Sequence, residues 1–118
     1  MNKALIAAGA TDAAIAVAAG AFGAHALRSR LEARALEVFE TATRYQMYHA
    51  LAIVLCAVIA TEGARVAGWI MQAGIAVFCG SLYALVLLDV QWFGAITPIG
   101  GLAFLVGWAV LAVSALKT

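Results

Sequence analysis

Charged residues are scarce in this sequence. They make up 11% of its 118 residues, whereas 66% of the residues are hydrophobic and the mean hydropathy is +1.03. A typical soluble domain has about 25% charged residues. A water-soluble fold of this size could not cover its surface with so few charges, so the composition indicates that lipid is the solvent.

Proline, cysteine motifs and basic runs are also lacking. Proline occurs once and no segment is of low complexity, which argues against linkers and disordered tails. The two cysteines, Cys56 and Cys79, lie in apolar runs without a CxxC motif, so we expect reduced, buried thiols rather than a disulfide framework. A net charge of +1 without a basic run predicts no nucleic-acid partner.

Four apolar runs predict an all-α fold, an integral membrane four-helix bundle that occupies residues 1–118 as a single domain. Spanning a membrane takes about 20 apolar residues. The first run is longer than the apolar part of a signal peptide, and three more runs follow it, so we treat it as a helix. Thr97 and Pro98 are typical of a helix start. The predicted spans are about 4–27, 45–60, 66–88 and 97–116.

An amphipathic helix is predicted at about 29–43, between the first two spans. Arg30, Arg34 and Glu37 fall on one face of this helix and apolar residues on the other. No proline or glycine interrupts residues 29–59, so we expect the helix to continue into the second span. Its first half must then lie at or outside the membrane interface.

Small residues recur along the rest of the chain. Gly63, in the short connection after the second span, is predicted to cap that helix. Glycines and alanines recur at three- and four-residue steps on several spans, which lets helices approach closely in lipid. The expected partners are therefore membrane lipids and a homo-oligomer of this chain.

Most of the uncommon polar side chains are predicted to gather at one end of the bundle. Four spans with short loops place the first and third connections on the same side of the membrane. At 1.5 Å per residue, His49 and Tyr83 both lie about 6–9 Å inside their helix ends. Such side chains avoid lipid and should face the bundle interior or the interface. The candidate ligand-binding residues are His25, Glu40, Arg44, Tyr45, Gln46, His49, Ser81, Tyr83 and Thr97.

Several chemistries remain open for these residues. His25, His49 and Glu40 are of the types that bind metals, but no tight motif such as His-x-x-x-His occurs, so no metal site or cofactor is assigned. Ser81 and His49 could join an acid in a hydrolytic triad, but no nucleophile-elbow sequence surrounds Ser81, and no catalytic residue is assigned. A pocket for a lipid head group or small polar molecule is a further reading, and an interhelical hydrogen-bond cluster is favoured. The two histidines also leave a proton-linked role open.

Two other predictions concern charged residues. Asp12 lies about 12 Å along the first helix, near the bilayer centre, where an ionisable group is costly. We expect it to hydrogen-bond a neighbouring helix in a protonated or partly hydrated form. Glu40 and Arg44 are four residues apart with the acid first, which predicts an ion pair at the mouth of the polar cluster.

Six motifs resemble one known family. They are residues 20–27 (GAFGAHAL), 39–42 (FETA), 44–51 (RYQMYHAL), 80–83 (GSLY), 97–101 (TPIGG) and 107–108 (GW). In this order, over essentially the whole chain, they are similar to the "domain of unknown function 423" family of small bacterial membrane proteins, whose animal relatives are named transmembrane protein 256. The resemblance implies a four-helix membrane protein without an established activity. All nine candidate residues match motif positions, whereas Asp12, Asp89 and the cysteines lie outside them.

The sequence thus predicts a multi-pass protein of the bacterial inner membrane with a structural or small-ligand or lipid-binding role, and it favours a non-enzymatic bundle. The alternative is a transporter or intramembrane enzyme that uses a His25/His49 polar cluster. For the orientation, the basic residues favour a cytoplasmic amphipathic helix. Resemblance to relatives with basic termini favours the reverse, and we expect cytoplasmic termini.

Overall fold

The computed structural model describes residues 1–117, which form helices and no strand. The elements are α1 (Lys3–Val17), η1 (Ala18–Gly23), α2 (Ala24–Leu27), α3 (Ala33–Ile59), α4 (Glu62–Gly74), η2 (Ile75–Cys79), α5 (Gly80–Leu88), η3 (Gln91–Ala95) and α6 (Thr97–Lys117). Of these, η1 and η2 are π-helical and η3 is a 3₁₀ helix.

Within these residues, four continuous helical runs are long and apolar enough to cross a membrane. They are Lys3–Leu27, Ala33–Ile59, Glu62–Leu88 and Gln91–Lys117. The predicted all-α membrane bundle of four helices is therefore confirmed.

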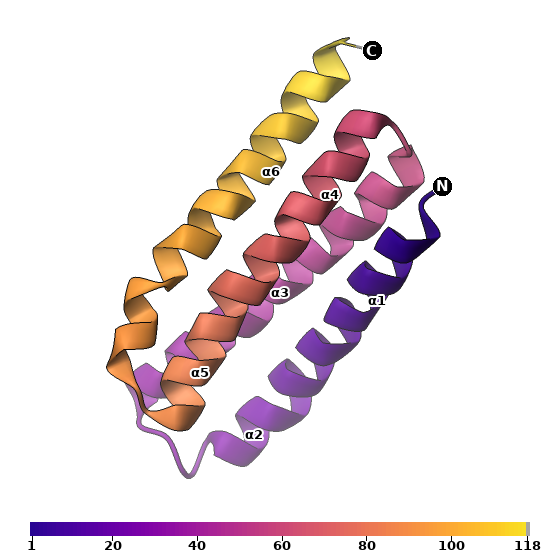
Figure 1. Ribbon diagram of the computed structural model, residues 1–118. Helices are drawn as coiled ribbons and strands as arrows, with labels where there is room; N and C mark the ends of the chain where they lie inside the picture. Colours follow the sequence, from indigo (N-terminus) through magenta and orange to yellow (C-terminus); the bar gives the residue numbers. More distant parts are fainter. Residues whose placement is uncertain (118) are drawn as a thin grey trace.

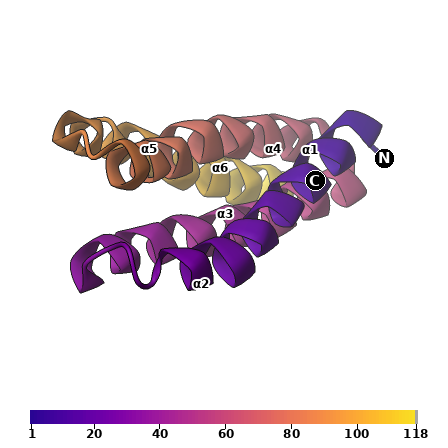
Figure 2. The same ribbon diagram turned by 90° about the horizontal axis from the view of Figure 1, so that it is seen from below.

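The helices form two pairs. α1 packs mainly on α3, and α4 packs mainly on α6, while α3 and α4 join the pairs. Both chain termini lie at one end of the bundle, and the α2–α3 connection and η3 lie at the other, which we call the loop end (Figure 1). The two pairs diverge toward the loop end (Figure 2). The molecule is 50 Å long, so its ends extend beyond a hydrocarbon core of about 30 Å.

The helix α3 carries both the amphipathic segment and the second span. It runs unbroken through 27 residues, about 40 Å at 1.5 Å per residue. It begins at Ala33 rather than at the predicted Ser29. The chain turns after Leu27, whose carbonyl accepts hydrogen bonds from the amides of Arg30 and Leu31, both at 2.9 Å. Glu32 is then extended (φ −67°, ψ 162°) before the new helix starts.

The connection between α3 and α4 differs from the prediction. Ala60, not Gly63, ends α3 in the left-handed conformation (φ 63°), and its amide donates to the Cys56 carbonyl at 3.1 Å. The hydroxyl of Thr61 accepts a 3.1 Å hydrogen bond from the Ala64 amide and so caps α4. Because this threonine starts the next helix at once, Gly63 falls in the first turn of α4 and the predicted glycine cap is wrong.

Within each pair the helices approach closely at glycines. A Cβ at Gly9 of α1 would lie 2.9 Å from the Ala50 carbonyl oxygen of α3. A Cβ at Gly100 of α6 would lie 2.3 Å from the backbone nitrogen of Phe78 in η2. Since real Cβ contacts are never this short, no larger residue fits at either position without moving a helix. These contacts follow the small-residue packing expected in lipid.

Candidate functional site

Gln46 and Tyr83 join the two pairs through a buried hydrogen bond. The Tyr83 hydroxyl of α5 donates to Oε1 of Gln46 in α3 at 2.7 Å, and Gln46 is only 3% exposed. The Phe39 ring meets the Tyr83 ring edge-on, with centroids 5.4 Å apart. The structure thus brings together two of the predicted residues, and their role in ligand binding stays a prediction.

His49 is held by groups from its own helix and from α6. Its Nδ1 lies 2.8 Å from the carbonyl oxygen of Tyr45, which can only accept, so Nδ1 carries the proton. Nε2 then accepts a 3.1 Å hydrogen bond from Nε1 of Trp108. The Phe104 ring stacks on the imidazole with centroids 3.5 Å apart. Both ring nitrogens of His49 therefore have partners within the protein.

Trp108 is the partner that sequence reasoning missed. It occurred in one of the motifs, but it was not included among the candidate residues. Trp108 is 43% exposed, but its indole N–H faces α3, and an indole N–H packed against a neighbouring helix usually has an acceptor. A search for acceptors on neighbouring helices would have pointed to the histidine.

Ser81 and Thr97 make a separate contact within the second pair. The Ser81 hydroxyl donates to the Phe78 carbonyl at 2.9 Å and lies 2.6 Å from the Thr97 hydroxyl. No hydrogen bond joins Ser81 to His49 in residues 1–117, so the hydrolytic arrangement considered from the sequence is not assembled.

Glu40 and Arg44 do not form the predicted ion pair. Among the described residues the one ion pair joins Glu62 to Arg65. Nη2 of Arg44 instead lies 3.5 Å from the Thr41 hydroxyl, and the arginine is exposed. An exposed helical pair contributes only about 0.3–0.5 kcal/mol, which is too little to hold a long side chain in place.

Two candidates remain, His25 and Tyr45. His25 is exposed on α2. Tyr45 is 40% exposed and packs its ring against Phe78, with centroids 5.0 Å apart. The Tyr45 ring also stacks on the His49 imidazole, with centroids 6.2 Å apart. The predicted cluster is therefore divided into three contacts, Tyr45 with His49, Gln46 with Tyr83, and Ser81 with Thr97. No group of three or more His, Cys, Asp or Glu side chains within residues 1–117 is arranged to hold a metal ion.

A second buried polar group surrounds Asp12, which is 6% exposed. The carboxamides of Gln46 and Gln72 lie beside its carboxylate. Oδ2 of Asp12 and Oε1 of Gln72 are buried without a hydrogen-bond partner in the described chain. We call Asp12, Gln46 and Gln72 the inner cluster. Its position within the membrane was the indication available from the sequence.

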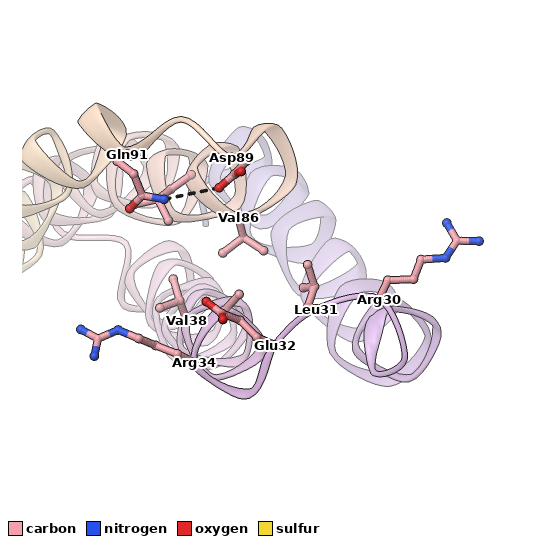
Figure 3. A pocket seen from close by; sticks show the side chains of 10 residues that line it. Arg30, Leu31, Glu32, Arg34, Val38, Val86, Asp89 and Gln91 are labelled. Carbon is pink, nitrogen blue, oxygen red and sulfur yellow. Dashed lines mark hydrogen bonds between the residues drawn. The ribbon is translucent and has the colours of Figure 1, made fainter.

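The loop-end cavity lies where the two pairs diverge. Its volume is about 380 Å³, and none of the nine candidate residues lines it. Arg30 and Arg34 extend outward on opposite sides, and Val86 projects between the Asp89 and Glu32 carboxylates (Figure 3). The amide of Gln91 donates to Oδ1 of Asp89 at 3.5 Å. The lining residues are Arg30, Leu31, Glu32, Arg34, Ala35, Val38, Leu85, Val86, Asp89 and Gln91.

Comparison with known proteins decides the family. The family model described as "Protein of unknown function (DUF423)" matches residues 19–101, more than half of the chain. The chain belongs to this family. The resemblance to the "domain of unknown function 423" family is thereby confirmed, whereas the kinship with transmembrane protein 256 stays a prediction.

The relatives extend this similarity over almost the full length. The chain is 48% identical to "UPF0382 membrane protein SAB0533" of Staphylococcus aureus (strain bovine RF122 / ET3-1), with 98% of this chain and 97% of the relative covered. It is 42% identical to "UPF0382 membrane protein YwdK" of Bacillus subtilis (strain 168), with 98% of each covered. No solved structure matches. With four apolar helices and bacterial relatives named membrane proteins, the chain is a multi-pass protein of the cell membrane whose activity is not established.

Proposed function

We propose that this protein is a non-enzymatic helix bundle that binds the head group of an amine-bearing phospholipid in the loop-end cavity. The observation that carries the proposal is the pairing of charges there. Two carboxylates, Glu32 and Asp89, share a cavity whose flanking arginines point outward (Figure 3). The cavity therefore offers acceptors for a cation, and the arginines at its rim carry donors for an anion.

A primary ammonium group suits the centre of this cavity. It carries three N–H donors, and the two carboxylates present acceptors for them. The lipid phosphate would then lie toward Arg30 or Arg34, because a guanidinium binds phosphate through two parallel hydrogen bonds. Leu31, Val38 and Leu85 supply an apolar surface for the glycerol and first methylene groups.

The size and depth of the cavity support the same ligand. Ligand sites commonly have volumes of about 300–1,000 Å³, and 380 Å³ falls in this range. The loop end extends past the apolar part of the bundle, because α3 is about 40 Å long and the hydrocarbon core is about 30 Å thick. The cavity is then at the level of lipid head groups.

Thermal unfolding in nanodiscs tests this proposal. Discs of phosphatidylethanolamine with phosphatidylglycerol should give a higher unfolding temperature than discs of phosphatidylcholine with phosphatidylglycerol, because choline has no N–H donor. The double variant Glu32→Gln, Asp89→Asn should lose this difference. Asparagine tolerates the left-handed backbone of Asp89 (φ 54°), so the turn is retained.

A matched control removes two carboxylates elsewhere. The double variant Glu37→Gln, Glu62→Gln alters exposed acids that do not line the cavity, and it should keep the preference for phosphatidylethanolamine. The proposal is wrong if both double variants keep the same preference as the unaltered protein.

A further inference from the structure

Asp12 is a buried acid without a cationic partner. Its side chain comes from α1 and is 6% exposed. Within residues 1–117 the one ion pair is that of Glu62 and Arg65, so no lysine or arginine neutralises this carboxylate. A carboxylate removed from water is costly unless a positive charge accompanies it.

The groups that face Asp12 come from three other elements, α3, α4 and η2. Gln46 of α3 and Gln72 of α4 lie beside the carboxylate. The titratable neighbours are Cys79 of η2, which lies close to Asp12, and Tyr83 of α5, which lies close to Cys79. The Tyr83 hydroxyl already donates to Oε1 of Gln46, so this donor is engaged.

Two acceptors of the inner cluster are left over. Oδ2 of Asp12 and Oε1 of Gln72 are both inaccessible to solvent, and no donor of the described chain reaches either atom. A buried acceptor without a donor is destabilising, and two of them in one cluster indicate a species that both can bind. The species must be small, because both oxygens are enclosed. It must also carry one positive charge, because the cluster holds one carboxylate.

We propose that Asp12 and Gln72 bind one small monovalent cation, a proton or an alkali-metal ion, inside the bundle. A proton would join the carboxylate and the carboxamide oxygen through one hydrogen bond. An alkali-metal ion would take the same two oxygens as two of its several oxygen ligands, the kind of ligand that hard cations prefer. Either species links α1 of the first pair to α4 of the second pair, so occupancy should stabilise the association of the two pairs.

Variants in nanodiscs test the site. The unfolding temperature is measured as pH is varied in choline chloride, and again at fixed pH as sodium or potassium replaces choline at constant ionic strength. Asp12→Asn keeps the size of the side chain but removes its charge. We expect the unaltered protein to respond to pH or to the alkali ion, and Asp12→Asn to lose that response. The surface variant Glu37→Gln is the control and should keep it.

The two parts of this measurement separate the two cations. A response to pH alone identifies the proton, and a response to sodium or potassium at fixed pH identifies the metal ion. Gln72→Leu removes the second oxygen and should weaken the cation response by about tenfold, which is the effect of one hydrogen bond to a charged group. Responses to pH and to alkali ions that are identical in the unaltered protein and in Asp12→Asn would overturn the proposal.

A second readout uses the unaltered protein and so does not depend on a variant that folds. Dicyclohexylcarbodiimide adds covalently to protonated carboxyl groups in apolar surroundings, and the adduct is located by mass spectrometry of peptides. We expect an adduct at Asp12 that forms faster as pH falls, and more slowly with an alkali ion if the metal ion is the bound species. An adduct that forms at the exposed Glu37 and not at Asp12 contradicts the site.

Discussion

The contacts within each helix pair differ in kind from the contacts between the pairs. Within the pairs, backbones approach each other at glycines, as at Gly9 against Ala50 and at Gly100 against Phe78. Between the pairs, a buried apolar cluster that includes Ile53 and Met71 is joined by polar contacts, the Tyr83–Gln46 and Trp108–His49 hydrogen bonds. Added volume should therefore destabilise the contacts within a pair most, whereas the loss of these hydrogen bonds should destabilise only the contacts between the pairs.

Both proposed binding sites lie between the pairs. The inner cluster joins α1 and α3 to α4, and the loop-end cavity lies between the α2–α3 connection and the end of α5. Close packing at Gly9 and Gly100 leaves no room for a ligand there, and the apolar cavity of about 550 Å³ between α4 and α6 offers almost no polar group. Polar side chains between the pairs provide acceptors and donors. The Ser81–Thr97 contact is the exception, because it is polar and lies within the second pair.

The largest expected effect comes from adding one methyl group within a pair. In Gly100→Ala the new Cβ would lie 2.3 Å from the nitrogen and 2.6 Å from the Cα of Phe78, so backbone must move. We expect a loss of about 3 kcal/mol in the free energy of unfolding in detergent micelles. Gly101→Ala is the control, because its nearest neighbours are 3.8 Å away, and it should cost almost nothing. Equal effects of the two changes would show that α6 does not pack closely at Gly100.

A smaller effect is expected from removing one donor between the pairs. Trp108→Phe keeps an aromatic ring but leaves Nε2 of His49 without its hydrogen bond. The free energy of unfolding should fall by about 1–2 kcal/mol. Trp69 is exposed, and its N–H donates to no residue of the described chain. Trp69→Phe should therefore change the free energy of unfolding little. Similar losses for both variants would mean that ring size, not the hydrogen bond, determines stability.

The smallest effect should be a gain. No atom lies within 4 Å of a Cβ placed at Gly80, and the residue is helical. Gly80→Ala should raise the free energy of unfolding by about 0.5–1 kcal/mol, because alanine loses less backbone entropy in a helix. The same unfolding measurement checks this value. A loss instead would indicate a close contact with lipid or with another copy of the chain.

Much of the fold could be predicted because it depends on the composition of short segments of the chain. Few charges and four apolar runs leave no alternative to spanning helices, and the chain order then places the two polar connections at one end. The helix boundaries were harder to predict because they depend on competing caps. The Thr61 cap starts α4 before Gly63. The Leu27 carbonyl accepts hydrogen bonds from two amides, and the turn that they form moves the start of α3 to Ala33.

For the candidate site residues, the sequence predicts how deep each lies along its helix but not which partner it contacts. Gln46 and His49 lie at similar depth, but three residues of helix turn them toward different partners, Tyr83 and Trp108. The π-helical segments η1 and η2 add to this, because one extra residue in a turn rotates the following side chains by about 100°. No pattern in the sequence predicts these π-helical segments.

The family motifs assign no role to Asp12, because it lies outside them. Its position in a membrane span is the better indication of a buried polar cluster.

The Gln46–Tyr83 hydrogen bond tests most directly whether polar contacts, together with the apolar cluster, hold the two pairs together. Tyr83→Phe leaves the buried Gln46 unsatisfied and Gln46→Leu leaves the half-buried Tyr83 hydroxyl unsatisfied, and each should cost about 1–3 kcal/mol in the free energy of unfolding. The double variant removes both groups, so its loss should be smaller than the sum of the two by about 1 kcal/mol. A control cycle of Tyr48→Phe with Tyr83→Phe, whose hydroxyls do not meet, should be additive. If the Gln46–Tyr83 cycle is additive as well, the two side chains are not coupled and the account of the contact between the pairs is wrong.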